Sequence, residues 1–205
     1  MSGPTMIGRE TEASTSLRVA RVLSEVLAPW ICAAVMPPVV AAMTTTPWWK
    51  GALHGLLVTA LAAAVPYAVV ARQVRTGRLS DRHISRREDR PRLLAMAVGC
   101  VLVALLVVRL LGASTSMQVF VLLMLASVGV GAVISRVWKV SMHALVLAAS
   151  VTVLVGLRPA LAPLAVLVPL VGWARWRETH HSPSQVVTGA ALGLALAAGA
   201  LAFTP

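Results

Sequence analysis

Three polar segments, separated by long apolar runs, carry the side chains of this sequence that could do chemistry. The first segment, residues 74–92, is rich in arginine and contains His83 and Arg90, which lie seven residues apart and would share one face of a helix. Pro91 follows directly and can occupy the first turn of the next helix. For most of these arginines, a basic loop that sets membrane topology is a sufficient explanation.

The second segment, residues 137–143, leads into an apolar run. Ser141 can cap a helix that begins there, and the free N–H groups at such a helix start form an anion site. Lys139 comes just before this cap, and His143 falls in the first turn. Taken alone, this segment favours the simpler interpretation, in which Ser141 is only a cap and His143 an interfacial histidine.

The third segment, residues 174–185, contains Arg175 and the adjacent histidines His180 and His181. Neighbouring residues on a chain rarely point at one metal ion, and no carboxylate cluster accompanies this pair. A zinc site is therefore not expected.

A second helix start follows in the same segment. Ser182, Pro183 and Gln185 have the types and spacing of a capping box with proline in the first turn. Gln185 therefore has a purely structural explanation beside any functional one.

Together, the three segments offer histidines and arginines with scarcely a carboxylate. A phosphoryl group in its transition state needs cations and hydrogen-bond donors around its equatorial oxygens. It also needs a nucleophile and an acid for the leaving group, and histidine can provide both near neutral pH. The residue types favour phosphoryl chemistry.

The composition indicates a membrane protein. Of the 205 residues, 58% are hydrophobic and 12% are charged, whereas soluble domains carry about 25% charged residues. The seven acidic residues avoid the middle of every apolar run, and they are Glu10, Glu12, Glu25, Asp81, Glu88, Asp89 and Glu178. The net charge of +11 sits in short segments between apolar runs, which favours anionic lipid headgroups and phosphorylated substrates over nucleic acid. Cys32 and Cys100 lie within apolar runs and are interpreted as small hydrophobic residues, with no disulfide or metal site.

Apolar runs long enough to cross a bilayer predict an all-α, polytopic transmembrane helix bundle. The clear candidates are residues 25–45, 51–73, 93–112, 116–136 and 184–203. A further apolar stretch from Ser141 to Trp173 is broken by a turn signal at Gly156–Pro159, which predicts two short helices, 142–157 and 159–174. The prediction is seven spans, or six if the first does not cross completely.

These spans form one transmembrane domain, residues 25–205. Residues 1–24 carry several charges, do not resemble a cleavable signal peptide, and are predicted to be a flexible or interfacial segment. On the last span, Gly189, Gly193 and Ala197 recur every four residues and predict close helix packing.

Seven spans place the three polar segments and the N-terminus on one side of the membrane. Fifteen of the 18 Lys and Arg residues then lie on that side, and Lys50, Arg109 and Arg158 lie on the other. The positive-inside rule places the polar segments in the cytoplasm, and we expect a bacterial plasma membrane.

In order and spacing, the three segments resemble the motifs of the type 2 phosphatidic acid phosphatase superfamily. That family's pattern is Lys-x6-Arg-Pro, then Pro-Ser-Gly-His, then Ser-Arg-x5-His-x3-Asp. The matching elements here are His83-x6-Arg90-Pro91, Val140-Ser141-Met142-His143 and Ala174-Arg175-x5-His181-x3-Gln185. The resemblance covers roughly residues 75–200.

The resemblance implies a division of labour. His181 would attack phosphorus and form a phosphohistidine, and His143 would protonate the leaving oxygen and then activate water. The phosphate oxygens would be bound by Arg90, Arg175 and His83, with help from Ser141 and, by our own conjecture, Lys139. No metal or other cofactor would be required.

Three positions depart from the family pattern. His83 replaces lysine and Met142 replaces glycine, which removes glycine's freedom for close backbone approach. Gln185 replaces the aspartate that orients the nucleophile. Gln185 could accept the same imidazole N–H but supplies no charge. Because both histidines and both motif arginines remain, an active divergent member is favoured over one that has lost catalysis.

The expected substrates are lipid phosphates or diphosphates made inside the cell, including phosphatidate, phosphatidylglycerophosphate and polyprenyl phosphates. Two alternatives remain open: a catalytically decayed membrane binding or scaffold protein, and a small transporter of an anionic substrate. Transporters usually place polar groups near the bilayer midplane, whereas these polar groups lie at span ends.

Overall fold

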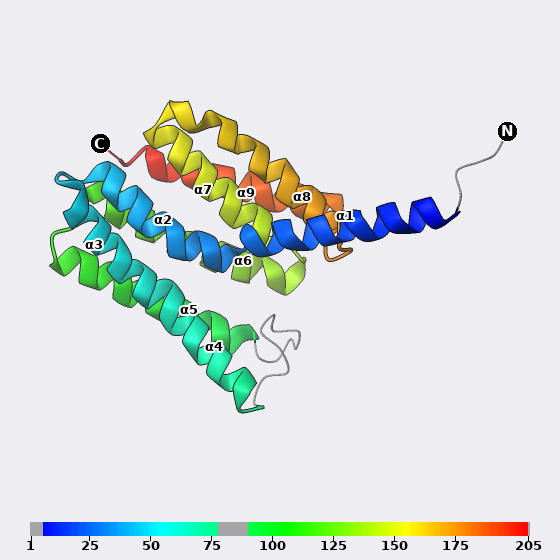
Figure 1. The fold of residues 1–205 in the computed structure, drawn as a ribbon. Coiled ribbons are helices and arrows are strands. Elements are labelled where there is room, and N and C mark those ends of the chain that lie inside the picture. Colours follow the sequence, from blue (N-terminus) through cyan, green and yellow to red (C-terminus); the bar gives the residue numbers. More distant parts are fainter. Residues whose placement is uncertain (1–5, 78–89, 205) are drawn as a thin grey trace.

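The computed structural model describes the backbone of residues 6–77 and 90–204, and the side chains of residues 14–77 and 95–204. Within these ranges the chain is helical and contains no strand (Figure 1). The elements are α1 (Met6–Val26), α2 (Pro29–Thr44), α3 (Trp48–Thr59), η1 (Ala60–Ala64), α4 (Val65–Arg75), α5 (Arg90–Leu110), α6 (Thr115–Val137), α7 (Met142–Leu157), η2 (Pro159–Val166), α8 (Leu167–Arg177) and α9 (Pro183–Leu201). Helices satisfy every backbone polar group within the segment, which a lipid environment requires. The all-α prediction is confirmed.

Several of the described helices are long and apolar enough to cross a membrane. Four meet both criteria: Trp48–Arg75, Thr115–Val137, Pro159–Arg177 and Pro183–Leu201. A fifth is counted if Ser14–Val26 and Pro29–Thr44, which are bent by 43° at their junction, form one span. Ala95–Leu110 and Met142–Leu157 are apolar but shorter. The described helices therefore give four or five candidate spans.

Successive helices run back and forth along the bundle (Figure 1). One end of the bundle holds the end of α4, the start of α5, the α6–α7 loop and the α8–α9 loop. The opposite end holds the α2–α3 loop, the α5–α6 loop, the break at Arg158 and the C-terminus. We call the first of these the polar-loop end. The loops and helix ends found at this end are those that alternating spans are expected to place together.

Helix α7 is the centre of the bundle, and α9 packs directly on it. On α7, eight residues are buried, from Ala144 to Val153. Gly189, Gly193 and Ala197 are the buried residues of α9. A Cβ at Gly189 would lie 2.5 Å from the Ser141 carbonyl oxygen, and one at Gly193 would overlap the Leu145 carbonyl oxygen. The predicted close packing of small residues is confirmed, because only glycine lets the two backbones approach this closely.

The predicted break within the apolar stretch is also present. Helix α7 ends at Leu157, Arg158 is extended, and a 3-10 segment beginning at Pro159 continues into α8. Proline has no N–H and sets φ near the helical value, so it starts the second helix after interrupting the first.

Helix α1 covers most of the segment that the sequence predicts to be flexible or interfacial. It bends away from α2 at Ala28–Pro29 and packs along α8 (Figure 1). Ala20 is fully buried there, and Ser24 is 4% exposed. The N-terminal helix is therefore in contact with the helix that leads into the third polar segment.

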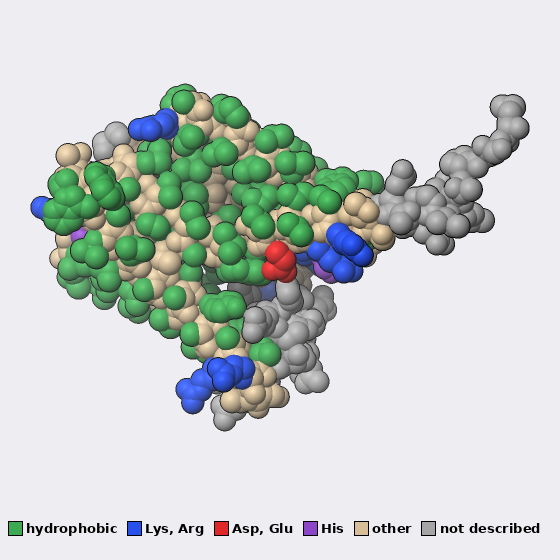
Figure 2. All heavy atoms as spheres, in the orientation of Figure 1, with side chains coloured by type: hydrophobic (Ala, Val, Ile, Leu, Met, Phe, Trp, Pro, Cys, Tyr) green, Lys and Arg blue, Asp and Glu red, His purple; other side chains and the backbone are tan. Residues whose placement is uncertain are grey.

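The surface matches a membrane protein with a charged end. Hydrophobic side chains cover most of the visible flank of the bundle, and Lys and Arg side chains gather near the end of α4 and where α1 meets α8 (Figure 2). The exposed hydrophobic residues of the bundle include Val35, Leu53, Leu106 and Leu194. Lipid contact explains an exposed apolar surface of this extent.

Candidate functional site

The second and third polar segments meet at the polar-loop end of the bundle. The Ser141 N–H donates a hydrogen bond to the Gln185 carbonyl oxygen at 3.2 Å. Lys139 Nζ donates to the His180 carbonyl oxygen at 2.6 Å. These two bonds join residues more than 40 positions apart and bring Lys139, the start of α7 and the histidine pair into one site.

The start of α7 is capped as predicted. Ser141 is fully buried, and its Oγ accepts the Ala144 N–H at 3.5 Å. His143 lies in the first turn of α7 and is half-buried. The first N–H groups of a helix carry partial positive charge and attract an anion.

A tight turn brings His181 back beside Arg175. Helix α8 ends at Arg177, Thr179 adopts the left-handed conformation with φ of 58°, and the His181 N–H then donates to the Arg175 carbonyl oxygen at 3.3 Å. A left-handed residue other than glycine costs about 1–2 kcal/mol. The backbone N–H groups of Glu178, Thr179 and His181 all donate hydrogen bonds within this turn.

The start of α9 is held by the predicted capping box. Ser182 Oγ accepts the Gln185 N–H at 3.3 Å, and Gln185 Oε1 accepts the Ser182 N–H at 3.1 Å. The structural explanation for Gln185 is therefore confirmed. Its side-chain oxygen is used in the cap.

His181 is held in its neutral form. Burial lowers the pKa of His181 to about 4, and the positive charges of Lys139 and Arg175 act in the same direction, with a smaller effect from His180. The neighbouring Gln185 side chain opposes these effects. A neutral imidazole keeps a lone pair available for attack at neutral pH.

One ring nitrogen of His181 has no acceptor. Nδ1 is buried and finds no hydrogen-bond partner among the described residues. Gln185 lies close enough to affect the pKa of the ring, but its oxygen is aligned on the Ser182 N–H. Nδ1 therefore lacks a described partner, while the Gln185 side chain still favours the charged form of the ring.

Arg175 is paired with a carboxylate that sequence reasoning did not include. Glu178 Oε2 accepts from Arg175 Nη1 at 3.1 Å and from Ser24 Oγ at 2.6 Å. The same oxygen lies 3.8 Å from His180 Nδ1. The Arg175 and Glu178 side chains are only 14% and 10% exposed. The spacing of Arg175 and Glu178 at i and i+3 could have indicated their ion pair, but nothing local could have identified Ser24.

Met142, which departs from the family pattern, has a packing role. A Cβ placed on Gly131 of α6 would overlap the Met142 Sδ atom, so the Met142 side chain lies against the backbone of α6 at a buried glycine. The larger side chain at residue 142 is accommodated by the missing side chain at residue 131.

Two of the predicted ligands belong to the first polar segment. His83 and the side chain of Arg90 lie outside the described residues. The backbone of α5 begins at Arg90, so Pro91 falls in the first turn as the sequence predicts. The end of α4 and the start of α5 nevertheless lie at the polar-loop end (Figure 1).

The described side chains contain no group of three or more His, Cys, Asp or Glu residues that could hold a metal ion.

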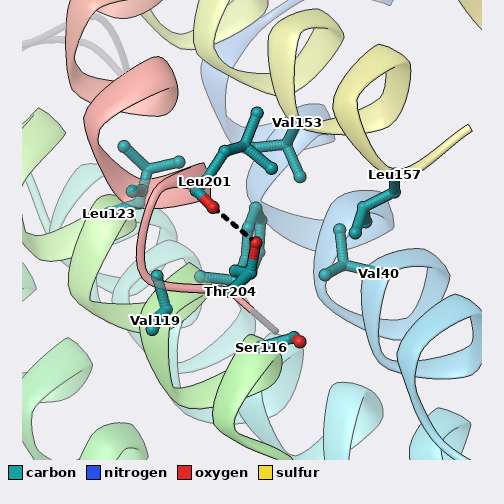
Figure 3. Close-up of a pocket in the computed structure, with 10 residues that line it drawn as sticks. Val40, Ser116, Val119, Leu123, Val153, Leu157, Leu201 and Thr204 are labelled. Atoms are coloured by element: carbon teal, nitrogen blue, oxygen red, sulfur yellow. Dashed lines mark hydrogen bonds between the residues drawn. The ribbon is translucent and has the colours of Figure 1, made fainter. Parts of the chain in front are cut away.

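A small apolar pocket lies at the opposite end of the bundle (Figure 3). It is lined by Val40, Ser116, Val119, Phe120, Leu123, Val153, Leu157, Ala200, Leu201 and Thr204. Thr204 donates its hydroxyl to the Leu201 carbonyl oxygen at 2.7 Å. Because none of these described lining residues is ionisable, this pocket offers no cation for an anionic group.

The site therefore combines a neutral histidine, a largely buried arginine side chain, a lysine and a capped helix start. Comparison of the chain with protein families, with curated proteins and with solved structures finds no match.

Proposed function

We propose that this chain is an integral membrane phosphatase that removes phosphate from a lipid monophosphate or diphosphate, through a phosphohistidine and without a metal. The observation that carries the proposal is the meeting of the second and third polar segments. The charges of Lys139 and Arg175 act on His181, a histidine whose pKa is about 4, and the start of α7 bonds to Gln185 in the same segment. This combination of cations, helix N–H groups and a neutral nucleophile suits a phosphoryl group.

The proposed reaction has two steps. A ring nitrogen of His181 attacks phosphorus, the bond from phosphorus to the lipid oxygen breaks, and protonated His143 gives its proton to that oxygen. Neutral His143 then takes a proton from water, the resulting hydroxide attacks phosphorus, and the bond to His181 breaks to release phosphate. Arg175 and Lys139 stabilise the charge on the phosphate oxygens, and Arg90 and His83 are proposed as further ligands from the first segment.

We further propose seven spans, in which α2, the continuous helix from α3 to α4, α5, α6, α7, the helix from η2 to α8, and α9 each cross. Helix α7 has 16 residues, which corresponds to about 24 Å of helix against about 30 Å of hydrocarbon. Its central position supports a crossing, since flanking polar residues and local thinning of the bilayer can accommodate a short helix. The polar-loop end then faces the cytoplasm, on the inner side of a bacterial plasma membrane.

A second function, binding of lipid phosphate without turnover, is favoured by one observation. His181 Nδ1 has no acceptor among the described residues, and Gln185 uses its oxygen in the helix cap. A histidine that is not oriented is a weaker nucleophile.

Phosphate release from purified protein tests both functions. The protein in detergent is supplied with a panel of lipid monophosphates and diphosphates in the presence of EDTA, beside His181→Ala and His143→Ala. We expect release by the wild type and loss of release in both variants. Lipid binding without release would support the second function, and a strict requirement for magnesium would overturn the proposed mechanism.

A further inference from the structure

We propose that Glu178 and Ser24 are positioning residues of the phosphate site, which makes the N-terminal helix α1 part of that site. This inference deepens the proposed function and rests on it. It concerns the chain of contacts from Ser24 on α1 through Glu178 to Arg175, which we call the Ser24 relay.

One carboxylate oxygen of Glu178 binds both Ser24 and Arg175. Glu178 Oε2 accepts both the Ser24 hydroxyl at 2.6 Å and Arg175 Nη1 at 3.1 Å. Hydrogen bonds to charged groups are short and about twice as strong as neutral ones. Ser24 is 4% exposed, so its hydroxyl does not exchange this partner freely for water.

Arg175 has one donor atom without a described partner. Its Nε atom is buried and has no hydrogen-bond partner among the described residues. The guanidinium thus keeps unused donor capacity while Nη1 is held by Glu178, and its charge acts on the adjacent His181. A guanidinium held at Nη1 loses less conformational freedom when its other donors bind a phosphate.

Helix α1 is attached to the end of α8 at a second point. Arg177 Nε donates to Ser16 Oγ at 3.1 Å, so α1 makes a second polar contact with the end of α8. That contact does not involve Arg175. Ser16 and Ser24 therefore offer a matched pair on one helix, in which Ser24 bonds to the partner of Arg175 and Ser16 bonds to Arg177.

The experiment compares Ser24→Ala with Ser16→Ala in the full-length protein in detergent. The affinity for inorganic phosphate is measured by calorimetry, and the titration of His181 is followed by NMR without phosphate. We expect Ser24→Ala to weaken phosphate binding by about tenfold, the equivalent of one charge-assisted hydrogen bond. It should also raise the pKa of His181, because Arg175 is then free to move away. Ser16→Ala should change neither quantity.

The outcomes separate the relay from the proposed function. If the wild type binds no phosphate but Ser24→Ala alone shifts the His181 titration, the proposed function is overturned and the relay stands. If Ser24→Ala and Ser16→Ala behave alike in both measurements, the relay is overturned. Glu178→Ala provides a second test, with a loss of phosphate affinity at least as large as that of Ser24→Ala.

Discussion

At the scale of single residues, His181 differs from a surface histidine in both charge and hydrogen bonding. Burial, Lys139 and Arg175 lower its pKa to about 4, whereas an unperturbed histidine titrates near 6.5. The ring is neutral at pH 7 and needs no general base to become nucleophilic. Its buried Nδ1 has no described acceptor, so orientation of the ring is the property most open to improvement.

The lowered pKa of His181 predicts how stability depends on pH. Since the folded protein favours the neutral ring, the stability that depends on this preference is complete above about pH 6.5. It is lost as the pH falls towards 4, the folded-state value. The melting temperature of the wild type should therefore fall between pH 6.5 and 4 more steeply than that of His181→Asn. Parallel melting curves over this range would contradict the prediction.

Gln185→Glu should improve the site. Glutamate at this position keeps the capping box, because its carboxylate can still accept the Ser182 N–H. It adds a negative charge beside His181, which should raise the pKa of the ring by about one unit or more and orient it for attack. We expect a rise in the NMR titration midpoint and faster phosphate release. Gln185→Leu serves as the control and should lose the cap without raising the pKa.

At the scale of elements, the site depends on how closely α9 approaches the start of α7. Gly189 lies against the Ser141 carbonyl oxygen, and the Ser141 N–H bonds to the Gln185 carbonyl oxygen. The glycines that pack the two helices therefore also hold two of the polar segments together. Packing and site geometry are coupled at this contact.

Gly189→Ala should damage both stability and activity. Its Cβ would lie 2.5 Å from a backbone oxygen that has little room to move, and overpacking of this kind costs roughly 1–3 kcal/mol. Gly199→Ala on the same helix is the matched control, because a Cβ there meets nothing within 4 Å. It should instead stabilise the helix by up to about 1 kcal/mol. Thermal unfolding in detergent and phosphate release provide the two measurements, and equal effects of the two variants would disprove the coupling.

The element-scale features were predictable because their causes are local or periodic. The capping box at Ser182, the cap at Ser141 and the break at Pro159 each follow from a few adjacent residues. The α9 packing face follows from a four-residue repeat. The contact of Ser24 with Glu178 joins residues 154 positions apart, and no local pattern signals it. The number of spans was also harder to predict from the sequence, since α7 is short for a membrane-crossing helix. Its central place in the bundle, which supports a crossing, is not visible in the sequence.

At the scale of the whole molecule, the basic residues divide unequally between the two ends. Near the polar-loop end, the described side chains include Arg18, Arg21, Arg72, Arg75, Arg136, Lys139, Arg175 and Arg177, whereas Lys50, Arg109 and Arg158 lie towards the other end. Only part of this excess is needed for phosphate binding. The remainder favours retention of this end in the cytoplasm.

Cysteine labelling tests this orientation. Thr76→Cys and Lys50→Cys place a thiol at exposed positions at the two ends of the bundle, in a background where Cys32 and Cys100 are replaced by alanine. With a membrane-impermeant maleimide, we expect Lys50→Cys to react in intact cells and Thr76→Cys to react only after permeabilisation. The reverse pattern would place the site outside the cytoplasm.

The central claim, phosphoryl transfer to His181, is tested most directly by trapping the intermediate. The protein is mixed with a lipid phosphate that it turns over, quenched in alkali to preserve phosphoramidates, and analysed by mass spectrometry of the peptide that contains both histidines. The predicted result is one phosphoryl group on His181, absent from His181→Ala. Turnover without a phosphohistidine, or a phosphoryl group on His180, which lies 3.8 Å from Glu178, would contradict the claim.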